Sequence, residues 1–185
     1  MSLTSETPTA QLAAGTWTVD TSHSSVGFAV RHLMVSKVRG TFETFSGTLG
    51  IADNPLDSWV EAVVELASVK TGDAARDAHL LSSDFFGVEE FPTMTLRSTS
   101  LRSDGSDYVL VADLTIKGIT HSVEFALTFD GTATDPWGNA KAGFSAEAEI
   151  NRRDWGMEFN MALDTGGVMV GEKVKIQLDI QAAKA

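Results

Sequence analysis

Several blocks of the chain alternate apolar and polar residues with a period of two. The clearest runs from residue 26 to residue 32 and reads VGFAVRH. Side chains two apart in a strand share a face, so Val26, Phe28 and Val30 form one apolar row and His32 ends the row on the same side. The pattern predicts a strand with one buried face that carries a polar ring at its end.

The same alternation recurs along the chain and is interrupted by turn-forming residues. It predicts about eight strands, at residues 16–20 continuing through 25–33, 39–51, 59–66, 93–101, 107–117, 122–130, 141–151 and 172–181. An even number of strands with short connections favours an all-β fold that closes as an eight-stranded antiparallel barrel. The interior of such a barrel either packs solid or holds a ligand.

One segment, residues 71–83, breaks the alternation. Asp73 is a candidate N-cap, and the alanines and leucines that follow it favour helix. We therefore expect a short helical segment at about residues 72–84. Its Leu80 and Leu81, followed by Phe85 and Phe86, are expected to cover the barrel as a lid.

A length of 185 residues suits a single domain. The first 15 residues are rich in Thr, Ser and Ala, which predicts a flexible lead-in at 1–15 and one barrel domain at 16–185. The sequence shows neither the continuous apolar run of a secretory signal nor a stretch of about 20 apolar residues that would span a bilayer. A cytoplasmic location without integral membrane association is the resulting expectation.

Composition excludes several classes of function. The chain carries 14 Lys and Arg against 25 Asp and Glu, and its net charge of −11 disfavours binding to nucleic-acid phosphates and to anionic bilayers. It has no cysteine, which excludes disulfides, zinc–thiolate sites and cysteine nucleophiles. The four histidines lie in separate segments without the spacing of a metal-binding pair, so we expect neither a metal nor a cofactor.

The candidate catalytic residues lie on the predicted helix. Arg76 and His79 share a face there, while Asp77 points away, and this favours structural docking over acid–base chemistry. A small-molecule enzyme that uses these three residues near the barrel mouth remains the alternative function. Outside the helix, His23 is interpreted as a ring that stabilises a turn. Residues 151–156 are interpreted as a salt-bridged turn in preference to a contact with a ligand head group.

Small residues within the inward-facing rows bear on whether the barrel is hollow. Ala62, Ala112, Ala146 and Ala148 interrupt rows of larger apolar side chains, which favours an internal cavity. The alternation of small and large residues that fills tapered barrels is the competing explanation. A barrel filled in this way would suit a stress-related interaction protein, which is a further alternative function.

An ordered series of motifs between residues 15 and 180 resembles the YceI-like family of lipid- or polyisoprenoid-binding proteins. The motifs include Trp17-x-Val19-Asp20-x-x-His23-Ser24, Gly40-x-Phe42-x-x-Phe45-x-Gly47, Arg76-Asp77-x-His79-Leu80, Leu114-Thr115-Ile116-Lys117-Gly118 and Ile150-Asn151-Arg152-x-Asp154-Trp155-Gly156. The resemblance implies an extended, lipocalin-like antiparallel barrel with a short helical segment near one end. It also implies a long apolar tunnel for an isoprenoid chain or a similar amphiphile, with polar groups near the mouth.

The expected function is non-enzymatic binding of a long-chain apolar ligand, for storage, transport or sequestration. A polyisoprenoid, an isoprenoid quinone or a fatty-acid derivative fits, and the sequence leaves monomer and homodimer open. His32 is expected to hydrogen-bond a polar head or a bound water. Strand parity predicts that the wall contains Phe28, Val30, Phe42, Phe45, Leu110, Leu114, Phe125, Phe144, Ala148 and Ile150.

Overall fold

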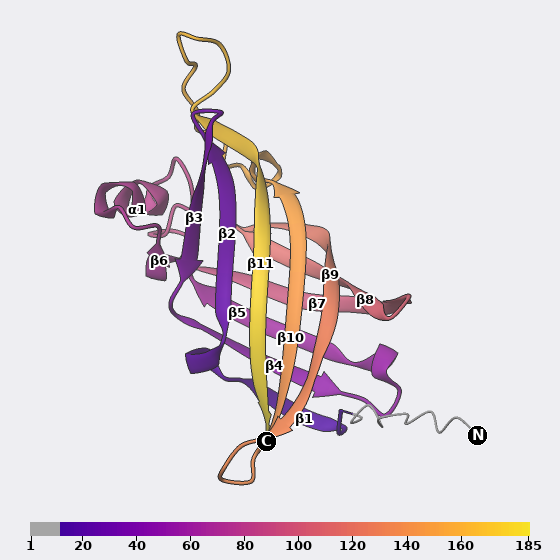
Figure 1. The fold of residues 1–185 in the computed structure, drawn as a ribbon. Helices are drawn as coiled ribbons and strands as arrows, with labels where there is room; N and C mark the ends of the chain where they lie inside the picture. Colours follow the sequence, from indigo (N-terminus) through magenta and orange to yellow (C-terminus); the bar gives the residue numbers. More distant parts are fainter. Residues whose placement is uncertain (1–11) are drawn as a thin grey trace, which may run out of the picture.

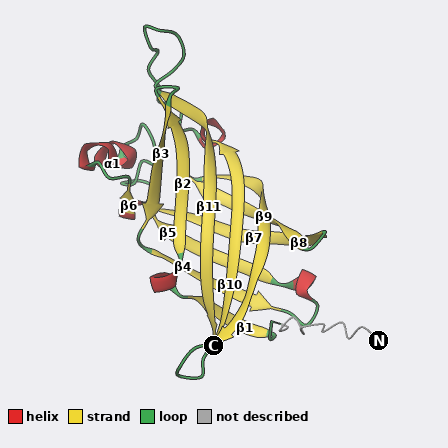
Figure 2. Cartoon of the chain, viewed as in Figure 1, coloured by secondary structure: helices red, strands yellow, loops and turns green. Residues whose placement is uncertain are grey.

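The protein folds as a closed antiparallel β-barrel with one short α-helix against its side (Figure 1, Figure 2). The coordinates are a computed structural model that describes residues 12–185. The helix is α1 (Ala74–Leu81), and four short 3₁₀ turns lie at Thr21–His23, Pro55–Asp57, Leu66–Ser68 and Arg152–Trp155. The strands are β1 (Gly15–Val19), β2 (Ser25–His32), β3 (Ser36–Phe42), β4 (Phe45–Ile51), β5 (Trp59–Glu65), β6 (Val69–Lys70), β7 (Thr93–Asp104), β8 (Asp107–Ile116), β9 (Ile119–Thr134), β10 (Ala140–Asn151) and β11 (Val170–Lys184).

These eleven strands form eight lengths of the barrel wall. β1 and β2 both pair with β11 and are separated only by the turn at Thr21–His23. β3 and β4 together form one length of the wall, with a short break between them, and so do β5 and β6. The barrel closes because β1 pairs with β4 on one side and with β11 on the other. The predicted eight-stranded antiparallel barrel is therefore confirmed.

Register places the alternating apolar rows inside. Phe28 of β2 lies opposite Ile176 of β11 and opposite Gly40 of β3. A Cβ atom at Gly40 would lie 2.3 Å from the Phe28 ring, so only glycine at this position leaves the ring its place. Gly40 of β3 thus leaves the space that the Phe28 ring of β2 occupies.

Helix α1 forms where the break in alternation predicted it. The Asp73 side chain accepts a hydrogen bond from the Arg76 backbone N–H at 2.9 Å, as expected of an N-cap. Leu80, Leu81 and Phe86 pack against a buried cluster that contains Phe42 and Leu66. The helix lies at the side of the barrel (Figure 1), and Leu80, Phe85 and Phe86 border the cavity from there. A lid over the barrel stays a prediction.

The predicted lead-in, residues 1–15, lies mostly outside the described residues. Leu12 packs against the buried cluster around Trp17, whose indole N–H donates to the Ala13 carbonyl at 2.9 Å. Strand β1 already begins at Gly15, one residue before the predicted start of the domain. Across residues 12–185, no helix is long and apolar enough to cross a membrane.

The turn at Thr21–His23 is held by Asp20. One carboxylate oxygen accepts from the Ser22 N–H at 3.1 Å and from the Ser22 hydroxyl at 2.7 Å, and the other lies 3.0 Å from His23 Nδ1. These hydrogen bonds from Ser22 and then His23 hold the pKa of Asp20 well below its usual range. The prediction that His23 stabilises a turn is confirmed.

Asp20→Asn is expected to destabilise the protein in a pH-dependent way. The depressed pKa means that the ionised carboxylate stabilises the fold above the ordinary carboxyl pKa of about 4, and that this contribution falls as the pH drops below it. Thermal unfolding should show a loss of about 2–4 °C at pH 7, which corresponds to about 1 kcal/mol for a weakened cap, and a smaller difference from the natural protein at pH 3. A pH-independent difference would contradict this assignment.

Candidate functional site

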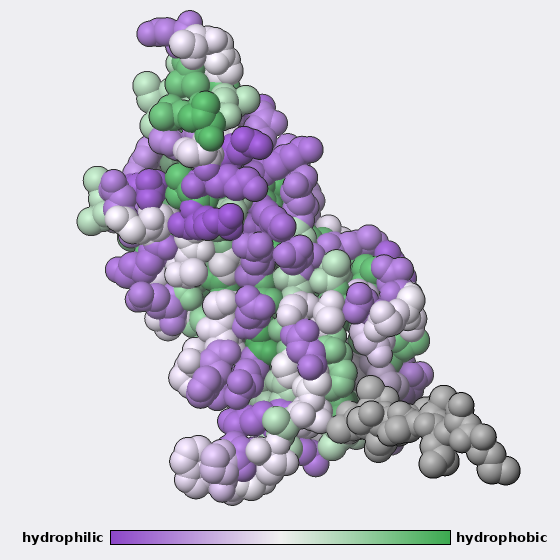
Figure 3. Space-filling model, viewed as in Figure 1, coloured by the Kyte–Doolittle hydropathy of each residue, from purple (hydrophilic) through white to green (hydrophobic). Residues whose placement is uncertain are grey.

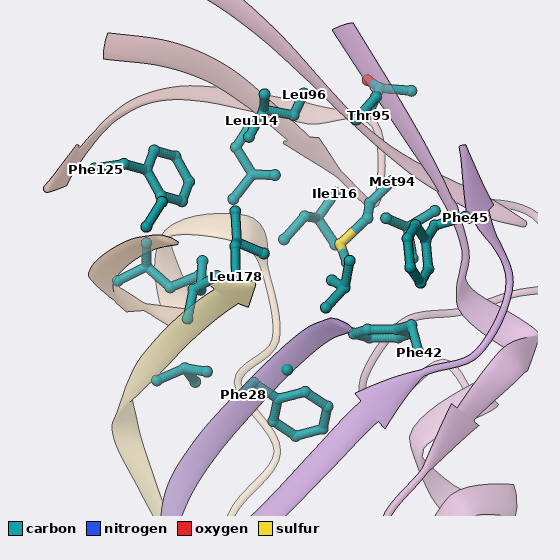
Figure 4. A pocket seen from close by; sticks show the side chains of 18 of the residues that line it. Phe28, Phe42, Phe45, Met94, Thr95, Leu96, Leu114, Ile116, Phe125 and Leu178 are labelled. Atoms are coloured by element: carbon teal, nitrogen blue, oxygen red, sulfur yellow. The ribbon is translucent and has the colours of Figure 1, made fainter. Parts of the chain in front are cut away.

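The barrel encloses an elongated cavity of about 350 Å³. Its wall includes residues of β11 from Val170 to Ile180, a stretch of about 30 Å of strand. Figure 4 shows aromatic and aliphatic side chains converging on this space, among them Phe28, Phe42, Phe45 and Phe125. The interior is therefore not solid, whereas the packed-barrel interpretation requires a solid interior.

The wall is almost entirely apolar, and its charged members are all of one sign. Among the described residues that line the cavity there is no Asp or Glu, whereas Arg31, Arg76 and Arg152 are present. This bias runs against the overall composition, because acidic residues outnumber basic ones 25 to 14 in the chain. The cavity suits an apolar chain whose polar end is neutral or negatively charged.

Strand parity placed most of the predicted residues correctly in space. Ten of the eleven line the cavity, and their contact with a ligand stays a prediction: Phe28, Val30, His32, Phe42, Phe45, Leu110, Leu114, Phe125, Phe144 and Ile150.

Ala148 is the exception. It is buried in the cluster that contains Trp155 and Met157, and it does not line the cavity. Its neighbour on the same face of β10, Ala146, does line it. Parity gives the direction of a side chain but not whether other side chains occupy the space in front of it. The small residues divide in the same way, since Ala62 borders the cavity and Ala112 does not.

The basic side chains of the lining are linked by contacts at one end of the cavity. The Arg152 guanidinium lies 6.0 Å from the centre of the Phe85 ring, and Phe85 packs edge-on against His79 with ring centres 5.1 Å apart. Arg152 also donates to the Val170 carbonyl, and Val170 pairs with His32. His32, His79 and Arg152 thus belong to one polar end of an otherwise apolar cavity.

Arg152 is the one charged side chain that is buried among the described residues, with 3% of its surface exposed. It donates to three backbone carbonyls, those of Gly171 at 2.8 Å, Met157 at 2.5 Å and Val170 at 3.3 Å. Burial lowers the pKa of the guanidinium, and Glu172 opposes that effect. An arginine remains charged under these conditions, so a full positive charge lies beside the cavity.

The prediction for residues 151–156 holds for only one of the two arginines. Arg153 forms the expected ion pair with Glu172 at 3.1 Å, with both side chains about half exposed. Arg152 points inward instead. It continues the even-numbered inward row of β10 that includes Ile150, so extending the alternation by one step would have found it.

The helix residues considered for catalysis are largely engaged in holding the backbone. Arg76 donates from Nε to the Thr71 hydroxyl at 2.8 Å and from Nη2 to the Thr71 carbonyl at 2.7 Å. Asp77 accepts from the Thr71 N–H at 3.0 Å. His79 lies 2.8 Å from the exposed carboxylate of Asp84. Across residues 12–185, no three His, Asp or Glu side chains are grouped so as to hold a metal ion.

Other wall residues were missed by the sequence analysis. Met94 and Leu96 of β7 and Leu178 of β11 follow the same alternation and were within reach of parity. Phe159 and Met169 come from the segment between β10 and β11, which has no strand period to read.

Comparison with known proteins agrees with the resemblance in the motifs. A family model described as the YceI-like domain matches residues 17–182. The chain belongs to the YceI-like family. UPF0312 proteins of Staphylococcus aureus, strains MSSA476 and USA300 among them, are 40% identical to it over 163 residues, which cover 87% of this chain and 93% of theirs.

Solved structures show the same fold at lower identity. BcnA of Burkholderia cenocepacia superposes with a TM-score of 0.77 at 21% identity and covers 88% of this chain and 98% of its own. The Campylobacter jejuni YCEI protein gives 0.71 at 24% identity, covering 84% and 90%. A polyisoprenoid binding domain from Saccharophagus degradans gives 0.66 at 16% identity, covering 91% and 98%.

Proposed function

We propose that this YceI-like protein binds, without chemical turnover, the long apolar chain of a lipid such as a polyisoprenoid, an isoprenoid quinone or a fatty-acid derivative. The observation that carries the proposal is the long apolar cavity whose few charged residues are arginines. The name of the Saccharophagus domain, which has the same fold, agrees with an apolar ligand of this kind. A cytoplasmic location and a homodimer stay predictions from the sequence.

The hydrophobic effect is sufficient to hold such a ligand. Each methylene group moved from water into an apolar cavity contributes about 0.8 kcal/mol, and a chain along the whole barrel buries many of them. The polar head then belongs at the end with His32, His79 and Arg152, because hydrogen-bond acceptors on the head meet only positive or neutral partners there.

Mass spectrometry of an organic extract from the purified protein tests this function directly. We expect an intact lipid with a long unbranched or isoprenoid chain, bound in a stoichiometric amount. Delipidated protein should take up the same lipid again. An extract without lipid, together with no uptake of long-chain probes, would contradict the proposal.

His32→Ala is expected to weaken binding of a lipid with a polar head by about three- to tenfold and to leave its pure hydrocarbon analogue unaffected. The reason is the loss of one hydrogen bond, which contributes about 0.5–1.5 kcal/mol net. Titration of both ligands into delipidated protein measures the difference. An equal loss for the two ligands would show that His32 only packs against the chain.

The pairing of His79 with Asp84 favours a second candidate, an enzyme acting on the ligand head. A carboxylate that orients a histidine ring is a common arrangement in general acid–base sites. The described residues around His79 supply no activated hydroxyl, since Ser82 Oγ donates to the His79 carbonyl. Recovery of a chemically altered lipid after incubation, with the change abolished by His79→Gln, would favour the enzyme over the binding protein.

A further inference from the structure

We propose that the end of the barrel formed by the turn between β2 and β3 docks on an anionic lipid bilayer. The inference rests on the proposed function for its purpose, since docking would bring the polar end of the cavity to a source of lipid. Its evidence is separate and consists of the side chains on the outer surface of this end and of the strands that lead to it.

Apolar side chains are exposed together at this end. Leu33, Met34 and Val35 form the turn and are 42%, 51% and 82% exposed, and Met161 in the neighbouring loop is 56% exposed. We call these four residues the apolar tip. The two segments are joined by a hydrogen bond from the Leu33 N–H to the Met169 carbonyl at 2.8 Å. Figure 3 shows hydrophobic atoms on this projecting end.

The conformation of the turn is unfavourable for the residues that occupy it. Leu33 and Met34 have φ values of 54° and 65°, in the left-handed region that glycine and asparagine normally fill in tight hairpins. Bulky apolar residues do not relieve the strain of this conformation, and Leu33 and Met34 keep 42% and 51% of their surface exposed. A strained position that displays such side chains to solvent is the kind of feature that function retains.

Positive charges without an ion pair extend along β2, β3 and β6 away from the apolar tip. Arg31, Lys37 and Arg39 on β2 and β3, with Lys70 on the adjoining β6, have no ion pair among the described residues, and Arg31 stands directly opposite Lys37. Like charges in directly opposed positions destabilise a sheet. We call these four residues the basic strip. By contrast, Arg97, Arg102, Arg153, Lys173 and Lys175 each lie within 4 Å of a glutamate.

A bilayer of anionic lipid is complementary to this combination. Each Lys or Arg near such a surface strengthens binding by about fivefold, while apolar side chains enter the acyl boundary. The acids of the segment between β10 and β11, Asp154, Glu158 and Asp164, are fewer than the four cations of the basic strip. This surface is therefore locally basic, although the chain as a whole carries a net charge of −11. The tip also adjoins the cavity, because Arg31, His32 and Met169 border both.

Co-sedimentation of the full chain with vesicles tests the proposal. The probes are vesicles of equal parts phosphatidylglycerol and phosphatidylcholine, and vesicles of phosphatidylcholine alone, at about 0.1 M salt, where surface charges still act over about 10 Å. We expect binding to the anionic vesicles to be at least about tenfold tighter. Met34→Asn with Val35→Ser should weaken it by roughly tenfold or more, and asparagine keeps the left-handed turn.

Lys37→Gln with Arg39→Gln should weaken binding to anionic vesicles by about 25-fold and leave binding to neutral vesicles unchanged. Matched controls are Trp137→Ser, which removes an 84% exposed side chain in the turn between β9 and β10, and Arg97→Gln with Arg102→Gln, which removes two charges elsewhere. Both controls should bind vesicles as the natural protein does.

Absence of vesicle binding by the natural protein, or equal losses in the tip variants and their controls, would overturn the proposal. Loss of self-association in the tip variants without any effect of vesicles would replace it with a contact between two copies of the chain. Uptake of a fluorescent polyene fatty acid in free solution, measured on the same variants, should be unchanged. If uptake fails in the natural protein, the proposed function fails while the docking result still stands.

Discussion

Ala146→Trp is expected to abolish uptake of long-chain ligands and to lower thermal stability less than the same change at Ala148. Ala146 borders the cavity on β10, so the indole ring would enter space that the chain of the ligand would occupy. Displacing about four methylene groups from the cavity, at about 0.8 kcal/mol each, already weakens binding by more than about a hundredfold.

Ala148→Trp is the matched control, because it makes the same change two residues along the same face. Ala148 belongs to the same buried cluster as Ala146 but does not border the cavity, so an indole ring there has no free space to enter. Such overpacking costs about 1–3 kcal/mol and lowers the melting temperature. Titration of a fluorescent polyene fatty acid and thermal unfolding of both delipidated variants would separate the two positions. A stable Ala146→Trp variant that binds normally would show that the chain of the ligand does not pass this residue.

Arg152→Ala is expected to lower the free energy of unfolding by about 3–5 kcal/mol. The change leaves the carbonyls of Met157, Val170 and Gly171 without their donor, and each buried unsatisfied group costs about 1–3 kcal/mol. Those carbonyls tie the turn after β10 to the start of β11. Denaturant unfolding measures the loss.

Arg153→Ala provides the comparison at the next residue. Its ion pair with Glu172 is exposed, so the expected loss is below about 1 kcal/mol. Should Arg152→Ala yield no folded protein, Arg152→Lys keeps the charge without the planar fork and is expected to fold with reduced stability. Equal losses for Arg152→Ala and Arg153→Ala would contradict the role of Arg152 as a bridge.

The fold was predictable because its main determinant is local. Alternation with a period of two is a property of each strand by itself, and it located the strands and the inward rows of residues such as Phe28 and Phe125. The break in that alternation, with Asp73 as its cap, located the helix for the same reason.

The candidate site was predictable only as far as parity reaches. Parity separates inside from outside, but Ala146 and Ala148 share a face and one buried cluster, and only Ala146 borders the cavity. Phe159 and Met169 lie in a segment without period, so their place at the wall depends on contacts between distant parts of the chain.

The sequence by itself determined a closed antiparallel barrel with an apolar interior, because burial of alternate residues is encoded in neighbouring positions. Tertiary structure alone decided which part of the interior is hollow and that Phe159 and Met169 border it. It also brought the apolar turn at residues 33–35 next to the loop around Met161. Each of these results depends on which side chains from separate strands fill the same space, and a one-dimensional pattern does not carry that information.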